Sequence, residues 1–139
     1  LLFKELPPDL IDVAVRQGAS KPNPISYMVI EQFGGAYGRR DKRETAFWHR
    51  DARHQIVIGG AWDDPADQER CIQWARDTHD ALAPYAMLGR NLNFTVVDQD
   101  ERMTRIQAAS GDNYARLVEI KTKYDPANLF RVNNNIPPA

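Results

Sequence analysis

The chain is poor in cysteine, in net charge and in long hydrophobic runs, and each shortage excludes a class of protein. Its one cysteine, Cys71, rules out an internal disulfide framework and a cluster of thiolate metal ligands. Eighteen basic and nineteen acidic side chains provide no strong field for nucleic acid or an anionic membrane. A run of about eighteen apolar residues is needed to span a bilayer, and the sequence contains none.

No basic-then-apolar stretch opens this sequence as a signal peptide would. A fragment of a longer protein would have lost its leader, so the compartment stays open. We expect a soluble protein, which is cytoplasmic if its source is bacterial.

Several common site motifs are also absent. The glycine pairs at 34–35 and 59–60 lack the Gly-x-Gly-x-x-Gly spacing that opens a helix onto a pyrophosphate. His49 and His54 lie five residues apart and His79 falls on an expected helix, a spacing that fits no standard zinc motif. There is no Gly-x-Ser-x-Gly nucleophile elbow. The sequence therefore predicts no metal site, and only weak capture of a cofactor by these residues alone.

Capping residues and prolines divide the chain into short helices. We expect helices to begin at Pro7-Pro8-Asp9, after Asp64-Pro65, near Asp98 and at Asp112, because these residue types satisfy or dispense with unpaired N–H groups. In the second helix, a stripe of mostly apolar residues recurs at helical spacing and should face a sheet: Cys71, Trp74, Ala75, Thr78 and Leu82.

Strands are expected at 25–33, 45–50, 54–62 and 88–97, and the first reads as covered on both sides because it is almost continuously apolar. The order of elements argues for an α+β fold, a mainly antiparallel sheet with helices packed on one face. With 42% hydrophobic residues, one domain over 1–139 is the default expectation.

The end of the chain is unusual for a terminus. Apolar residues that favour burial alternate with three amides, Asn133, Asn134 and Asn135, that need hydrogen-bond partners. Asp125 precedes Pro126, so the preceding helix should end there. The whole pattern over 121–138 is Lys-x-Lys-Tyr-Asp-Pro-x-Asn-x-Phe-Arg-x-Asn-x-Asn-Ile-x-Pro.

This pattern resembles the closing motif of FAD-linked oxidases of the berberine-bridge-enzyme type. Upstream, 113–121 resembles their Asn-Tyr-x-Arg-Leu-x-x-Ile-Lys stretch, and Asn91-x-Asn93-Phe94 sits where they have a Tyr-x-Asn-Tyr or Tyr-x-Asn-Phe strand. Gly34-Gly35, and Thr45-Ala46-Phe47 followed by His49-Arg50, resemble features of bacterial members.

The resemblance implies that residues 1–139 are a C-terminal fragment of a substrate domain, with a berberine-bridge-type closing segment at 85–139. The family's substrate domain is an antiparallel sheet backed by helices, and its open face covers the flavin. No part of the chain resembles the family's FAD-binding domain, so most of the FAD would be held by a missing N-terminal domain. The whole protein would be an oxidase in which FAD takes hydride from a small-molecule substrate and the reduced flavin is then reoxidised by oxygen. The fragment alone should be inactive.

The resemblance also assigns flavin-facing amides. Asn93 matches the asparagine of the family's strand, and Asn133 and Asn135 match the closing Asn-x-Asn. An amide offers a donor and an acceptor, as the edge of the flavin ring requires. Asn134 should point the other way in an extended chain. The alternative is that all of these amides only satisfy neighbouring backbone groups.

The catalytic base is left open. In many family members the second tyrosine of the strand deprotonates the substrate, but here its position is Phe94, which has no ionisable group. The base is then another residue, belongs to the missing half, or is not needed. Tyr27, Tyr37 and His49 are local candidates, while Arg50 either binds a carboxylate or phenolate with His49 or forms a surface ion pair with Asp51.

A rival hypothesis from another class is an independent, non-catalytic α+β module for binding or dimerisation. A sheet face meant to cover a flavin domain would be left exposed in the fragment, which favours self-association into a homodimer.

Overall fold

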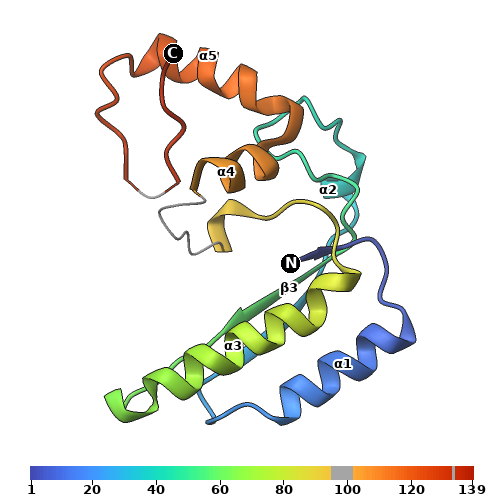
Figure 1. Ribbon diagram of the computed structural model, residues 1–139. Coiled ribbons are helices and arrows are strands. Elements are labelled where there is room, and N and C mark those ends of the chain that lie inside the picture. Colours follow the sequence, from blue (N-terminus) through green and yellow to red (C-terminus); the bar gives the residue numbers. More distant parts are fainter. Residues whose placement is uncertain (95–101, 133) are drawn as a thin grey trace. The chain divides into compact units, whose positions relative to one another are not determined.

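The computed structural model describes residues 1–94, 102–132 and 134–139, in two compact units (Figure 1). The first unit comprises Leu1–Gly34 and Ala52–Met87, and the second comprises Gly35–Asp51 and Leu88–Ala139. Within the described ranges, no helix has the length and hydropathy needed to cross a bilayer. Each unit has its own internal contacts and is described separately.

The first unit contains a three-stranded antiparallel sheet. The strands are β1 (Leu2–Phe3), β2 (Tyr27–Gln32) and β3 (His54–Gly59), in the order β1-β3-β2. In the register of β2 and β3, Val29 is paired with Val57, and directly paired residues share one face of a sheet. The expected α+β fold with an antiparallel sheet is confirmed.

Two helices, α1 (Pro8–Ala19) and α3 (Gln68–Leu82), pack against the same face of this sheet (Figure 1). The core of the unit shows this directly, because residues of both helices meet residues of β1 and β3. Its fully or nearly fully buried members are Phe3, Leu10, Ala14, Ile56 and Leu82. Burying such side chains stabilises each by about 1.5–3 kcal/mol relative to exposure.

The start of α3 agrees with the sequence. Asp64 Oδ1 accepts a hydrogen bond from Ala66 N at 2.9 Å, and Pro65 occupies the first position of the 3-10 turn that leads into the helix. The expected apolar stripe is buried at Cys71, Trp74, Thr78 and Leu82. The helix therefore begins and faces the core for the reasons that its sequence indicates.

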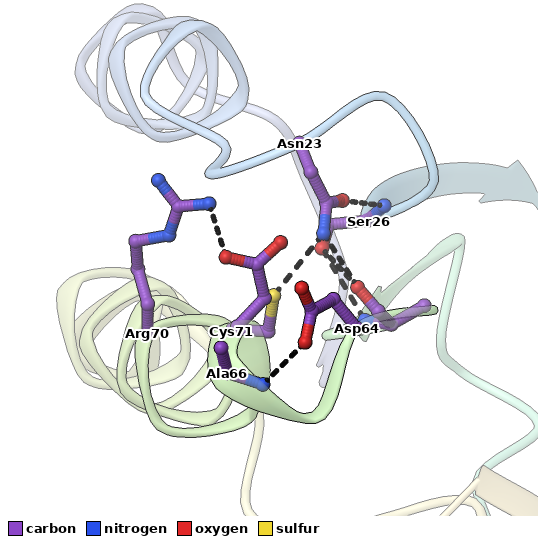
Figure 2. Close-up of polar contacts among 8 residues, drawn as sticks. Asn23, Ser26, Asp64, Ala66, Arg70 and Cys71 are labelled. Carbon is purple, nitrogen blue, oxygen red and sulfur yellow. Dashed lines mark hydrogen bonds and ion pairs between the residues drawn. The ribbon is translucent and has the colours of Figure 1, made fainter.

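Cys71 lies beside the side chain of Asn23, which bonds the loop before β2 (Figure 2). Asn23 Nδ2 donates to Ala61 O at 2.8 Å and lies 3.2 Å from Cys71 Sγ, while Asn23 Oδ1 accepts from Ser26 N at 2.7 Å. Cys71 is buried and free. The cysteine thus fills space in the core, and the asparagine ties the loop before β2 to α3.

Strand β2 differs from its prediction. It is an edge strand in the described sheet, and the side chains of Tyr27, Val29 and Ile30 are 43–52% exposed rather than covered on both sides. Continuous apolarity does not distinguish an edge strand from a central one, because the pattern carries no information about neighbours.

The second unit consists of helices and turns over its described residues. Its helices are α2 (Ala36–Arg39), α4 (Arg102–Ser110) and α5 (Tyr114–Tyr124). The stretch 45–50, expected to be a strand, forms turns and loop. Asp112, the expected cap of α5, lies in a 3-10 turn before the helix, and Asn113 occupies the N-cap position.

The expected strand at 88–97 is wrong over 88–94, and 95–97 lie outside the described residues. Leu92–Phe94 forms a 3-10 turn. Asn91 accounts for it: its side-chain Oδ1 accepts from Asn93 N at 3.2 Å and its carbonyl accepts from Phe94 N at 3.1 Å. These local bonds use N–H groups that a strand would offer to a neighbouring strand.

Candidate functional site

The last part of the closing segment, residues 125–139, begins where α5 ends, and the name is kept for this part from here on. Asp125 leaves the helical conformation, with φ −142° and ψ 60°, as expected for a residue before proline. Its carboxylate accepts hydrogen bonds from Leu129 N at 2.7 Å and Phe130 N at 3.0 Å. The Asp125 side chain therefore fixes the direction that the chain takes after the helix.

Lys121 completes this arrangement. Its ammonium donates to Asp125 Oδ2 at 2.5 Å and to the carbonyl of Phe130 at 2.6 Å. The hydrogen bond from Lys121, followed by the N–H bonds from Leu129 and Phe130, lowers the pKa of Asp125 below its usual value even though burial acts in the opposite direction. The carboxylate is thus held ionised.

The three amides differ in their environments. Asn134 Nδ2 donates to Leu92 O at 2.8 Å, so Asn134, which was expected to point away, links the closing segment to the turn that contains Asn93. Asn93 is exposed and Asn135 is half-buried, while Asn133 lies outside the described residues. The structure therefore brings the two segments that carry the predicted amides together. The contact is made by Asn134, next to Asn135, and by Leu92, next to Asn93.

An open hollow of about 410 Å³ lies between α5 and the closing segment. Its polar groups come from one ion pair and two amides, and its remaining walls are apolar. The residues that line it are Leu117, Ile120, Lys121, Tyr124, Asp125, Phe130, Val132, Asn134, Asn135 and Ile136.

His49, a candidate base, is a buried side chain in the second unit. Its Nε2 lies 3.2 Å from Ala108 O, so this nitrogen carries the hydrogen in that bond. Burial lowers the pKa of His49 and outweighs the bond to Ala108, which raises it. The ring packs on Gly89, where φ is +123° and an added Cβ would lie 2.0 Å from a ring carbon. His49 is neutral and enclosed, and its Nε2 is already engaged.

Tyr37 is a weak candidate for a base as well. Its hydroxyl donates to His49 O at 3.2 Å, and burial raises the pKa of Tyr37 to about 12, with Asp51 adding to the shift and Arg50 opposing it. Since ionisation is disfavoured and the hydroxyl already donates to a carbonyl, Tyr37 supports the loop rather than taking a proton.

Arg50 is held by its own loop. Its guanidinium lies 5.0 Å from the ring centre of Tyr37 and 5.3 Å from that of Phe47, and it donates to Thr45 Oγ1 at 2.5 Å. Asp51 forms an ion pair with Lys42 at 3.1 Å. Cation–π contacts and a short side-chain bond thus orient Arg50 within the loop.

Tyr27 is the candidate base with a substantially exposed side chain, at 47%. It lies in the first unit, on the sheet face opposite the core helices, and its ring covers its paired residue Gly59. An added Cβ at Gly59 would come within 2.4 Å of the ring. Glycine at this position therefore lets the ring lie flat on the sheet beside the Val29 and Val57 pair.

Among the residues that the structure describes, no group of three or more His, Cys, Asp or Glu side chains could hold a metal ion.

Comparisons with known proteins indicate the family that the chain resembles. Residues 92–137 match the sequence family described as "Berberine and berberine like". The chain is berberine-bridge-enzyme-like.

Two curated relatives of this berberine-bridge-enzyme-like chain are named as FAD-linked oxidoreductases. An FAD-linked oxidoreductase of Dictyostelium discoideum is 28% identical over 131 residues, which cover 94% of this chain and 28% of the relative. The uncharacterized FAD-linked oxidoreductase YgaK of Bacillus subtilis is 31% identical over 117 residues, 84% of this chain and 25% of YgaK. The chain spans about a quarter of the length of these relatives.

Solved structures support the fold. Berberine bridge enzyme from Eschscholzia californica matches with a TM-score of 0.75 and 23% identity, over 99% of this chain and 32% of that one. The glycopeptide hexose oxidase DBV29 matches with a TM-score of 0.80 and 18% identity, over 99% and 31% of the two chains. The chain thus shares the fold of about a third of the berberine bridge enzyme chain.

Sequence reasoning missed the pairing of Lys121 with Asp125 and with the backbone of Phe130. A signal was present, because a lysine and an aspartate four residues apart at the end of a helix are placed to meet. The aspartate is Asp125 and the lysine is Lys121. In this berberine-bridge-enzyme-like chain its side chain is 15% exposed and its charge is paired.

Proposed function

We propose that this chain is the C-terminal, substrate-covering portion of an FAD-dependent oxidoreductase that uses oxygen as its acceptor. The observation that carries the proposal is the family match over 92–137, together with similarity to FAD-linked oxidoreductases over most of the chain. Since the chain spans about a quarter of those relatives, the FAD-binding domain would lie in the remainder. On its own the fragment would be inactive.

Within this proposal, Asn93, Asn133 and Asn135 are the amides that meet the flavin edge. The described members fit such a role, because Asn93 is exposed and Asn135 is half-buried at an open hollow, and an amide can both donate and accept. The bound flavin would accept hydride from the substrate and pass the electrons to oxygen. Most of the FAD would be bound by the other domain.

The open face of the sheet would cover the substrate. Tyr27, Val29 and Val57 lie on the face opposite the core helices, and the first two are 47% and 43% exposed. Such a face could exclude water from a small-molecule substrate. The catalytic base is not assigned. Phe94 cannot take a proton, and His49 Nε2 and the Tyr37 hydroxyl are already hydrogen-bonded to backbone carbonyls. Tyr27 is the candidate whose side chain is exposed.

We propose that residues 1–139 are a single fragment of the substrate domain, and that its berberine-bridge-type part is 85–139. Exposed apolar side chains in the closing segment, Leu129, Phe130 and Val132, are 76–82% exposed and suit contact with an FAD-binding domain. They would equally suit a homodimer of a non-catalytic module, which is the competing function.

The test uses the longest natural gene product that contains this chain. We expect it to purify with flavin absorbance and to consume oxygen with an oxidisable substrate, while the 139-residue chain ignores added FAD. Asn93→Ala and Asn135→Ala should shift the flavin spectrum, whereas Gln73→Ala, an exposed amide on α3, should not. A colourless product that ignores FAD and forms a dimer would instead support the module.

A further inference from the structure

The contacts between α5 and the closing segment concentrate at one ion pair. We use "the grip" for Lys121 and Asp125 together with the backbone of Leu129 and Phe130. In the grip, the Phe130 N–H donates to the Asp125 carboxylate, and the Phe130 carbonyl accepts from the Lys121 ammonium. Leu129 N donates to the other carboxylate oxygen at 2.7 Å. Two side chains thus fix three consecutive peptide groups.

The far end of the closing segment returns to the same part of the helix. Ala139 N donates to Thr122 Oγ1 at 2.8 Å, and that hydroxyl donates to Val118 O at 2.8 Å. Thr122 is the neighbour of Lys121 along the helix. The segment between Phe130 and Ala139 is therefore a loop with both ends bonded to one turn of α5.

The two side chains of the grip have little solvent-accessible surface. The side chains of Lys121 and Asp125 are 15% and 10% exposed. A second ion pair on the same helix, Arg116 with Glu119, has side chains that are 72% and 66% exposed. Solvent screens an exposed pair strongly and a buried one weakly, so the two pairs should differ in their structural effect.

At its Phe130 end, this loop has little apolar packing. Phe130 and Val132 are 82% and 81% exposed, which leaves hydrogen bonds as the main restraint at that end, whereas Ile136 further along is half-buried. Between the two ends, the described side-chain bond is from Asn134 to Leu92 O at 2.8 Å. The location of Asn134 and Asn135 therefore depends on how firmly the ends are held.

We propose that Lys121 and Asp125 are positioning residues, which set the place of Asn134 and Asn135 by gripping the backbone at Phe130. The consequence for a flavin rests on the proposed function, but the positioning itself does not. Loss of the grip would release the loop at one end and move the amides, while leaving α5 and the first unit unchanged.

The test is NMR of the isotopically labelled 139-residue chain. In Asp125→Asn, we expect hydrogen exchange of the Leu129 and Phe130 amides to accelerate by roughly 10-fold or more, because a charged acceptor is lost. The side-chain amide signals of Asn134 should move toward those of a free amide. Glu119→Gln, which breaks the exposed pair on the same helix, should change neither.

A second variant keeps the proposal open to refutation if Asp125→Asn fails to fold. Lys121→Met retains the length of the side chain and leaves the N–H bonds of Leu129 and Phe130 in place, so it should produce a smaller change of the same kind. Accelerated exchange at Leu129 and Phe130 without any change in the Asn134 side-chain signals would overturn the proposal, since the grip would then be purely local.

The two proposals fail separately. In a flavin-bearing longer protein, Asp125→Asn should also shift the flavin absorbance. If no flavin is found there, the proposed function falls and the NMR result for the loop still decides the positioning. If flavin is present but the Asn134 signals do not respond to Asp125→Asn, the positioning falls and the proposed function remains.

Discussion

In the first unit most buried side chains are apolar, whereas in the second most are polar. The first unit buries Leu2, Phe3, Leu10, Ala14, Ala52, Ile56, Cys71, Trp74 and Leu82, with Ser26, Gln55 and Thr78. Among its described residues, the second unit buries Ile106 and Ala109, with His49, Ser110, Asn113 and Asp125. The largest apolar residues of its closing segment are exposed.

Apolar burial and hydrogen bonds to the backbone stabilise a structure in different ways. Apolar burial is strong but non-directional, so it suits a unit that has to keep a sheet and two helices together. Hydrogen bonds to backbone groups are individually weaker, but they fix particular peptide groups in particular places. The second unit uses such bonds at Asn113, His49 and Asp125, each of which bonds the backbone of another segment.

The largest expected effect is in the apolar core of the first unit. Leu10→Ala removes a fully buried side chain that packs with Phe3, Ile56 and Leu82, and should cost about 2–5 kcal/mol of unfolding free energy. Denaturant unfolding followed by circular dichroism would measure it. Val15→Ala on the same helix, where Val15 is 64% exposed, should cost far less. Equal losses for the two variants would remove the distinction between core and surface.

A buried amide should stabilise the second unit measurably. Asn113 Nδ2 donates to Lys42 O at 2.7 Å and Thr45 O at 3.0 Å, so Asn113→Ala leaves two carbonyls without this donor and should cost about 1–3 kcal/mol. The same unfolding measurement tests it. Asp112→Ala, next to it but exposed, is the matched control. A cost near zero for Asn113→Ala would mean that water replaces the amide freely.

A smaller, pH-dependent effect is expected from His49. Burial lowers its pKa below the unfolded value of about 6.5, so an unfolded chain takes up the proton first as pH falls. The stability that the neutral ring contributes is complete above about pH 6.5 and is lost as pH decreases from there toward the lower, folded pKa. Unfolding free energies at about pH 7.5 and about pH 5.5 would measure this loss.

The control for this prediction is His49→Gln, which removes the titration but can still donate to Ala108 O. The variant should show a weaker decrease in stability between the two pH values than the parent chain. An identical decrease in both proteins would show that another group is responsible.

Local signals in the sequence were sufficient for the helices of the first unit. Asp64 and Pro65 lead into α3 as expected, and the stripe from Cys71 to Leu82 is buried, because caps and helical periodicity depend on nearby residues alone. The strands were less predictable. An apolar run specifies neither edge nor centre, and Asn91 formed a turn where a strand was expected, because its bonds to Asn93 and Phe94 compete with sheet pairing.

The family and the closing segment could be recognised from sequence, but the geometry of the site could not. Asn134 makes the contact to Leu92, although alternation along an extended chain predicted that it would face away. The closing segment is not extended: the grip and Asn128, with φ at +51°, turn it back before the amides are reached. The roles of Asn93, Asn133 and Asn135 remain predictions.

The smallest expected effect is at the exposed apolar residues of the closing segment. Phe130 is 82% exposed and its backbone, rather than its ring, is bonded by the grip, so Phe130→Ala should change the unfolding free energy by less than about 0.5 kcal/mol. Ile106→Ala, in the same unit but fully buried, should cost about 2–5 kcal/mol and is the control. If Phe130→Ala destabilises the chain as much as Ile106→Ala does, the ring is packed in solution, and the closing segment is held by apolar contacts like the first unit. If it does not, the exposed ring is free to contact a partner, and what holds the segment in place is its hydrogen bonds.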